Sequence, residues 1–142
     1  MNIKPYISKK DVQKVCQELG LRDWTVLTDT KVTLEEAKRI QEVVGHEALS
    51  ISKEAFKQGL EVELEHGLQF PDANVTNNHP ILTGMIVLAH LKEMLDYYLR
   101  LEVAELEGDM YKAYLSGDFQ KLGKEYHKLQ RARAALADYE VI

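Results

Sequence analysis

Two pairs of ionisable residues with helical spacing are the part of this sequence most suited to chemistry. Glu63-x-x-His66 ends one amphipathic segment, and His90-x-x-Glu93 lies within the next. Residues three apart lie on the same side of a helix, and both pairs fall on the apolar side of their predicted helices. If the two helices pack together, two imidazoles and two carboxylates meet. These are the ligands of a Zn, Mn or Fe site.

Three interpretations of this cluster stay open. A carboxylate that is buried without a partner is strongly destabilising, so it is tolerated when paired, protonated or bound to a cation. The first interpretation is a divalent metal site formed by Glu63, His66, His90 and Glu93. The second is a structural network in which Glu63 pairs with His90 and Glu93 pairs with His66. The third is a metal-free pocket with an acid–base pair.

The segment between the two pairs is expected to cover the cluster. Residues 68–79 contain a proline and three asparagines, which is typical of a loop. Because this loop joins the two helices that carry the pairs, we expect it to fold back over their junction. Asn74, Thr76 and His79 would then shape the mouth of the site, and Tyr97 would orient a ligand.

The remaining patterns predict the helices that position these residues. Residues 8–20 and 33–45 form an ungapped repeat, and each copy begins with a capping box and ends with Gly. A third helix is predicted from about Ser52 to His66, where Gly67 would end it. A long central helix is predicted from Pro80 to about Glu107.

The C-terminal part also has helical periodicity. After an interruption at Gly108-Asp109, residues 110–140 predict a short helix and a final helix. The apolar stripe of that final helix would be Phe119, Leu122, Tyr126, Leu129 and Leu136. We therefore predict an all-α fold, a single-domain bundle of about five to six helices spanning residues 1–142. Its parts are a duplicated pair of capped helices (8–45), a site-bearing helix-loop-helix (52–107) and C-terminal helices (110–140).

Composition narrows the classes of function. The 142 residues carry a formal net charge of −5 and no basic cluster, which argues against nucleic-acid binding. No signal peptide and no apolar stretch long enough to span a membrane occur, and the single cysteine allows no internal disulfide. We expect a cytoplasmic protein. A protein partner or a second copy could bind through Tyr98, Tyr139 and the C-terminal end, which are predicted to be exposed.

Several motifs resemble a family of small bacterial and phage-encoded proteins of unknown function. They are ELEHG at residues 63–67, NVT at 74–76 and TGMIVLAHL at 83–91, followed by Glu93, Asp96, Tyr97 and Tyr98. The resemblance covers roughly residues 32–101 and includes all four residues of the two ionisable pairs. Because the family has no assigned activity, the resemblance implies none for this chain. This chain differs from the family pattern where Asn78-His79 replaces two acids, Met85 replaces Lys and Leu95 replaces Pro.

Two functional hypotheses follow. One is a metal-binding protein or metal-dependent hydrolase that uses the Glu/His cluster. The other is a non-catalytic interaction module whose polar cluster is structural. The sequence leaves open whether the protein is an enzyme.

Overall fold

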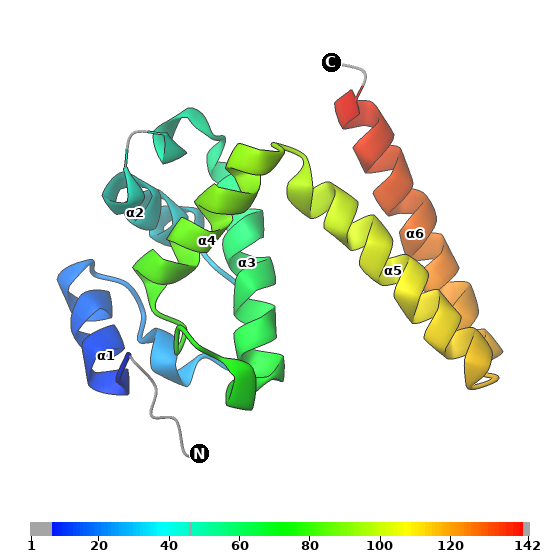
Figure 1. Cartoon of the computed structure of the whole chain (residues 1–142), viewed down its shortest axis with the longest axis horizontal. Coiled ribbons are helices and arrows are strands. Elements are labelled where there is room, and N and C mark those ends of the chain that lie inside the picture. Colours follow the sequence, from blue (N-terminus) through cyan, green and yellow to red (C-terminus); the bar gives the residue numbers. More distant parts are fainter. Residues whose placement is uncertain (1–6, 46, 141–142) are drawn as a thin grey trace. The chain divides into compact units, whose positions relative to one another are not determined.

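The structure is a computed structural model that describes residues 7–45 and 47–140, and all regular structure in these ranges is helical. The all-α prediction is confirmed, since the described residues form six α-helices and three short 3-10 helices and contain no strand (Figure 1). The chain divides into two compact units, residues 1–92 and 93–142, and each is described by itself. One domain over residues 1–142 stays a prediction. Residues 7–45 and 47–140 contain no helix with the length and apolar character needed to cross a membrane.

The first two helices have the capped ends that the repeat predicts. Helix α1 (Lys9–Glu18) begins with a complete capping box between Ser8 and Asp11. Helix α2 (Leu34–Val44) begins with the same arrangement between Thr33 and Glu36. The glycines that close the two copies, Gly20 and Gly45, have φ angles of +62° and +110°, which favour glycine over residues with a side chain.

The connector between α1 and α2 is held by one buried carboxylate. Glu36 accepts two hydrogen bonds of 2.9 Å from the Arg22 guanidinium and one of 3.4 Å from the indole of Trp24. Trp24 begins the 3-10 helix η1 (Trp24–Val26) and is fully buried. Burial raises the pKa of Glu36, but the hydrogen bonds from Arg22, Thr33 and Trp24 and the charge of Arg22 outweigh it and lower that pKa to about 2.

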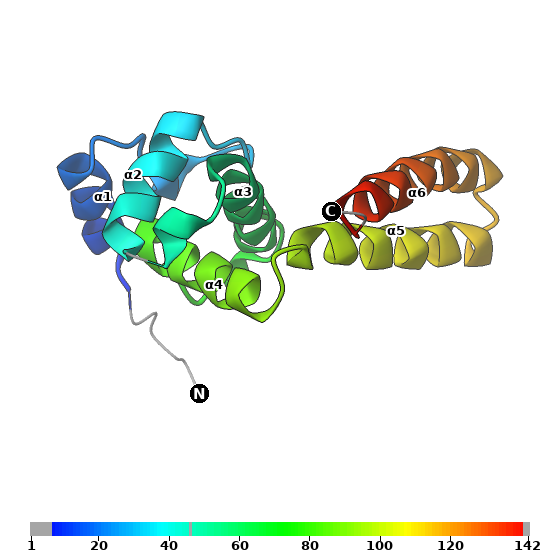
Figure 2. The same cartoon turned by 90° about the horizontal axis from the view of Figure 1, so that it is seen from above.

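Helices α2, α3 (Lys53–Gln69) and α4 (Pro80–Glu93) build the core of the first unit (Figure 2). Ile40, Phe56 and Val87 are fully buried, one from each helix. Gly84 lets α4 approach closely, since a Cβ built there would lie 2.7 Å from Cγ2 of Ile40. The 3-10 helix η2 (Ala48–Ser50) lies between α2 and α3.

Helix α3 is longer than predicted. It continues through Gly67 to Gln69, and the 3-10 helix η3 (Pro71–Ala73) follows. The prediction that Gly67 ends the helix is wrong. A side chain at Gly67 would collide with those of Asn74 and Asn78, so this glycine makes room for the following loop.

The single long central helix is also a wrong prediction. Helix α4 ends at Glu93, and α5 begins at Tyr97 and continues through Gly108 to Leu115. The intervening residues 94–96 shift the helical phase, so residues beyond them face other directions than a continuous helix would give. Tyr98, predicted to be exposed, is therefore only 3% exposed and packs edge-on against Tyr97, with 5.1 Å between ring centroids. Tyr139 is exposed as predicted, and Val141–Ile142 lie outside the described residues.

The second unit contains a hairpin of two helices, α5 and α6 (Phe119–Glu140), which lie side by side in both views (Figure 1, Figure 2). The turn between them contains Gly117, whose φ is +72°. The seam consists of Leu106, Leu129 and Ala132, with Val103 and Met110 packed against them. Spacings of three and four residues along such a seam are typical of coiled-coil packing. Phe119 and Tyr126, predicted to belong to the apolar stripe, are exposed instead.

Candidate functional site

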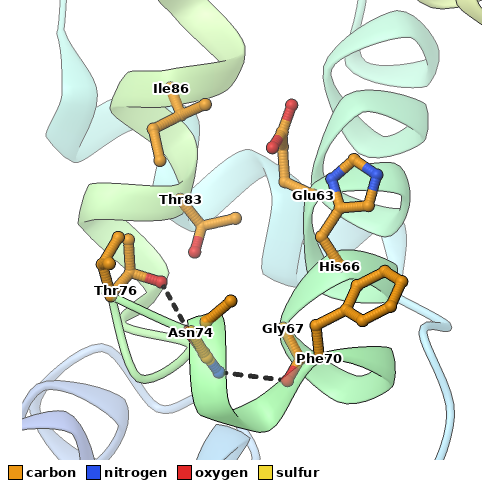
Figure 3. A pocket seen from close by; sticks show the side chains of 10 residues that line it. Glu63, His66, Gly67, Phe70, Asn74, Thr76, Thr83 and Ile86 are labelled. Atoms are coloured by element: carbon orange, nitrogen blue, oxygen red, sulfur yellow. Dashed lines mark hydrogen bonds between the residues drawn. The ribbon is translucent and has the colours of Figure 1, made fainter.

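A pocket lies between the end of α3, the loop that follows it and the first turns of α4 (Figure 3). Its volume is about 190 Å³. The lining residues are Glu63, His66, Gly67, Phe70, Ala73, Asn74, Val75, Thr76, Thr83 and Ile86. Glu63 carries the only formal charge among them near neutral pH, since none is Lys, Arg or Asp and His is counted as neutral.

Glu63 is positioned by a histidine from the facing helix. The Nδ1 atom of His90 lies 3.1 Å from Oε1 of Glu63. An ionised carboxylate only accepts hydrogen bonds, so Nδ1 is the protonated nitrogen in this contact. The Glu63 side chain is 13% exposed and that of His90 is 31% exposed. The contact joins α3 to α4 and fixes the carboxylate at the wall of the pocket.

The loop after α3 folds back onto that helix and closes one side of the pocket, as predicted. The amide of Asn74 donates to the Gly67 carbonyl at 3.3 Å and to Oδ1 of Asn78 at 2.8 Å. The Thr76 hydroxyl donates to Oδ1 of Asn74 at 3.3 Å. Asn77 and Asn78 have φ angles of +52° and +59°, a conformation that asparagine tolerates better than most residues. These short polar side chains hold the loop in place.

His79 has a structural part in this arrangement. Its Nδ1 accepts a hydrogen bond of 3.3 Å from the backbone N–H of Leu82, and its carbonyl accepts bonds from the backbone and hydroxyl of Thr83. His79 therefore caps the N-terminus of α4 and does not line the pocket. Burial lowers the pKa of His79, opposed by a backbone hydrogen bond and the negative charge of Asp11.

The structure brings part of the predicted site together. Glu63, His66, Asn74 and Thr76 line the pocket, and His90 is bonded to Glu63. Of these residues, His66 is exposed to solvent. Glu93 and Tyr97 do not line the pocket: Glu93 is exposed at the end of α4, and Tyr97 begins α5.

Several residues that line the pocket were not predicted from the sequence. Phe70 carries no signal that separates it from an ordinary loop residue. Thr83 and Ile86 belong to the TGMIVLAHL motif, but nothing in that motif marks them as residues of a site. Gly67 did carry a signal, because a glycine that follows a conspicuous motif marks either the end of a helix or the close approach of a neighbouring group. The structure shows the close approach.

The positions of the possible metal ligands can be compared with the predicted metal site. No group of three or more His, Cys, Asp or Glu side chains that could hold a metal ion occurs within residues 7–45 and 47–140. The described donors therefore do not fit a centre with three or four protein ligands. A metal site at Glu63, His66, His90 and Glu93 stays a prediction.

Comparison with known proteins gives one match. A family described as "Protein of unknown function (DUF5661)" matches residues 12–107, which include most of α1, all of α2 to α4 and more than half of α5. No curated protein and no solved structure matches the chain. The match includes every residue that lines the pocket.

Proposed function

The chain belongs to the DUF5661 family, whose function is unknown, and we propose that its first unit binds a small ligand carrying a positive charge. The observation that carries the proposal is the placement of Glu63, an acid at the wall of a pocket whose lining contains no Lys or Arg. Such a lining favours an ammonium or guanidinium group over an anion. Phe70 and Ile86 would contact the apolar part of the ligand.

The size of the pocket limits the ligand. A volume of about 190 Å³ is roughly that of six water molecules at about 30 Å³ each. Pockets for drug-sized molecules span about 300–1,000 Å³. A short amine or the end of a basic side chain fits within this volume.

The Glu63–His90 contact supports the same assignment. Because His90 holds one carboxylate oxygen in place, the acid is preorganised for a ligand and loses little side-chain freedom when the ligand binds. The contact also makes a divalent transition metal the second candidate cation, since carboxylate and imidazole are common ligands of such metals. A metal would have to take further ligands from water or from a substrate. No reaction is assigned to the pocket.

The test compares two probes of similar size and opposite charge. Butylammonium and butyrate are titrated separately into uniformly ¹⁵N-labelled full-length protein, and the backbone amide signals are followed by NMR. Butylammonium is expected to shift the signals of Gly67, Asn74 and Thr83, whereas butyrate is not. Equal responses to the two probes would contradict the proposal.

Matched variants locate the binding charge. Glu63→Gln keeps the size of the side chain and removes its charge, so it should abolish the response to butylammonium. Glu65→Gln makes the same change at an exposed position two residues away and should retain the response. A third titration with zinc distinguishes the two cations. Zinc-dependent shifts at Gly67 and Asn74 that a chelator reverses, without any response to butylammonium, would assign the pocket to a metal.

A further inference from the structure

One face of the α5–α6 hairpin carries four exposed aromatic side chains. We call it the aromatic face; it consists of Tyr111 and Tyr114 on α5 and Phe119 and Tyr126 on α6. Their exposed fractions are 63%, 62%, 68% and 48%. Exposed aromatic residues are normally scattered, and a contiguous group marks an interaction surface.

Helical spacing and one ion pair place the four residues on the same face. Glu107 on α5 and Arg133 on α6 form an ion pair of 2.7 Å across the hairpin. Tyr111 and Tyr114 lie four and seven residues after Glu107, and Tyr126 and Phe119 lie seven and fourteen residues before Arg133. These spacings keep each set on the side of its helix that carries the ion pair.

The opposite end of the same face has small side chains. Ala104 lies three residues before Glu107, and Ala137 lies four residues after Arg133; both are exposed. A second ion pair of 2.7 Å, between Arg100 and Glu140, also crosses the hairpin at this end. The charges on the face are thus paired within one copy, and large and small side chains occupy opposite ends.

This arrangement is self-complementary. If a second copy is placed face to face with its α5 reversed, Glu107 and Gly108 lie nearest the two-fold axis. Tyr111, three residues after Gly108, then lies over Ala104 of the other copy, which is three residues before Glu107. Large side chains meet small ones, as close packing requires. Because the ion pairs form within each copy, no unpaired charge is buried.

The area of the face agrees with an interface between two copies. With about 200 Å² for a fully exposed aromatic side chain, the four residues present roughly 500 Å² in each copy. A standard interface buries about 800 Å² per partner, so these residues alone would supply more than half of it. The hairpin also has a small core of its own, centred on Leu106, Leu129 and Ala132, and it gains burial when two hairpins form a four-helix bundle.

We infer that the chain forms a homodimer in which the aromatic faces of two α5–α6 hairpins pack with reversed helix direction. This inference is independent of the ligand pocket, which lies in the first unit. All of α6 lies beyond the part of the chain that matches the family, and so do Tyr111 and Tyr114 on α5. Dimerisation would therefore be a property that this chain adds to the family domain.

The test measures the mass of the full-length protein in solution by light scattering and sedimentation over a range of micromolar concentrations. The wild type is expected to have twice the mass of one chain. Tyr111→Glu should weaken the dimer at least about 100-fold, because two-fold symmetry places two carboxylates in the interface. Tyr139→Glu is the matched control, since Tyr139 is an exposed tyrosine of the same hairpin that lies outside the aromatic face.

Two further variants keep the inference falsifiable. Phe119→Glu changes the other helix of the same face and should also give a monomer, while circular dichroism verifies that the helices are intact. Ala104→Trp fills the small end and should weaken the dimer if the helices run in reversed directions. A monomeric wild type would overturn the inference. A dimer that resists Tyr111→Glu and Phe119→Glu, or one that Tyr139→Glu dissociates, would overturn it as well.

Discussion

Replacing Glu36 with glutamine tests the strongest electrostatic feature of the first unit. The carboxylate is buried, with a side chain that is 7% exposed, and it accepts hydrogen bonds from Arg22, Trp24 and the backbone of Thr33. Glutamine has the shape of the protonated acid but no charge. The Glu36→Gln variant therefore loses the free energy by which the fold favours the ionised form.

The pKa of Glu36 gives the size of that loss. The folded protein lowers the pKa from 4.5 to about 2. At about 1.4 kcal/mol for each pKa unit, the ionised side chain stabilises the fold by about 3 kcal/mol. Because the pKa is lower in the folded state, this contribution is complete above about pH 4.5 and is lost as the pH falls towards 2.

The assay is urea denaturation followed by the fluorescence of Trp24, the only tryptophan in the chain. Trp24 contacts Glu36 directly, so its signal reports on unfolding of the first unit. The Glu36→Gln variant should be about 3 kcal/mol less stable than the wild type at neutral pH, and the difference should shrink towards zero as the pH approaches 2. Glu35→Gln, at an exposed neighbouring position, should change stability by less than about 0.5 kcal/mol. A difference between Glu36→Gln and wild type that stays constant from neutral to acidic pH would refute the reasoning.

Three further predictions concern single positions. Gly84→Ala should destabilise the first unit by about 1–3 kcal/mol, measured by the same fluorescence assay, because its Cβ would lie 2.7 Å from Ile40. Gly108→Ala has open space for its Cβ within one copy, so in the Tyr111→Glu background, where no dimer forms, it should stabilise the hairpin by up to about 1 kcal/mol in thermal unfolding followed by circular dichroism; a loss of stability there would contradict this. Burial lowers the pKa of His79, so the contribution of the neutral side chain to stability is complete above about pH 6.5 and is lost as the pH falls below that value. His79→Asn keeps a capping side chain without the titration, and its stability relative to wild type should therefore rise below that pH.

Local hydrogen-bond patterns made the helix starts predictable. The capping boxes of α1 and α2 need only the backbone and a side chain three residues away, so the sequence contains all the information that they require. The left-handed turns at Gly20 and Gly45 are equally local. The same kind of reasoning placed the loop between α3 and α4.

The wrong predictions depend on contacts between distant residues. The break between α4 and α5 contains no Gly or Pro, so no local signal marks it, and an error of three residues changes the face of every later side chain. For this reason Tyr98 was assigned to the surface. Gly67 was ambiguous because a glycine can end a helix or admit a neighbouring side chain, and the loop decides between these roles.

The aromatic residues of α6 illustrate a different difficulty. Phe119 and Tyr126 share a face, and periodicity alone assigns that face to the core. In the hairpin the seam uses Leu129 and Ala132 instead. An apolar stripe shows that a helix has a face to bury, but it does not show whether the partner is the same chain or another one.

Two side chains of the loop before α4, Asn78 and His79, accept hydrogen bonds that a carboxylate could also accept. Oδ1 of Asn78 accepts from Asn74, as an aspartate oxygen would, and asparagine and aspartate both tolerate the positive φ found there. Nδ1 of His79 accepts from the backbone N–H of Leu82, which is the role of an acidic cap. Asn78 and His79 therefore hold the loop without placing a carboxylate beside the pocket. Glu63 is the only acid that lines the pocket, so the charge preference of the site should depend on that one side chain.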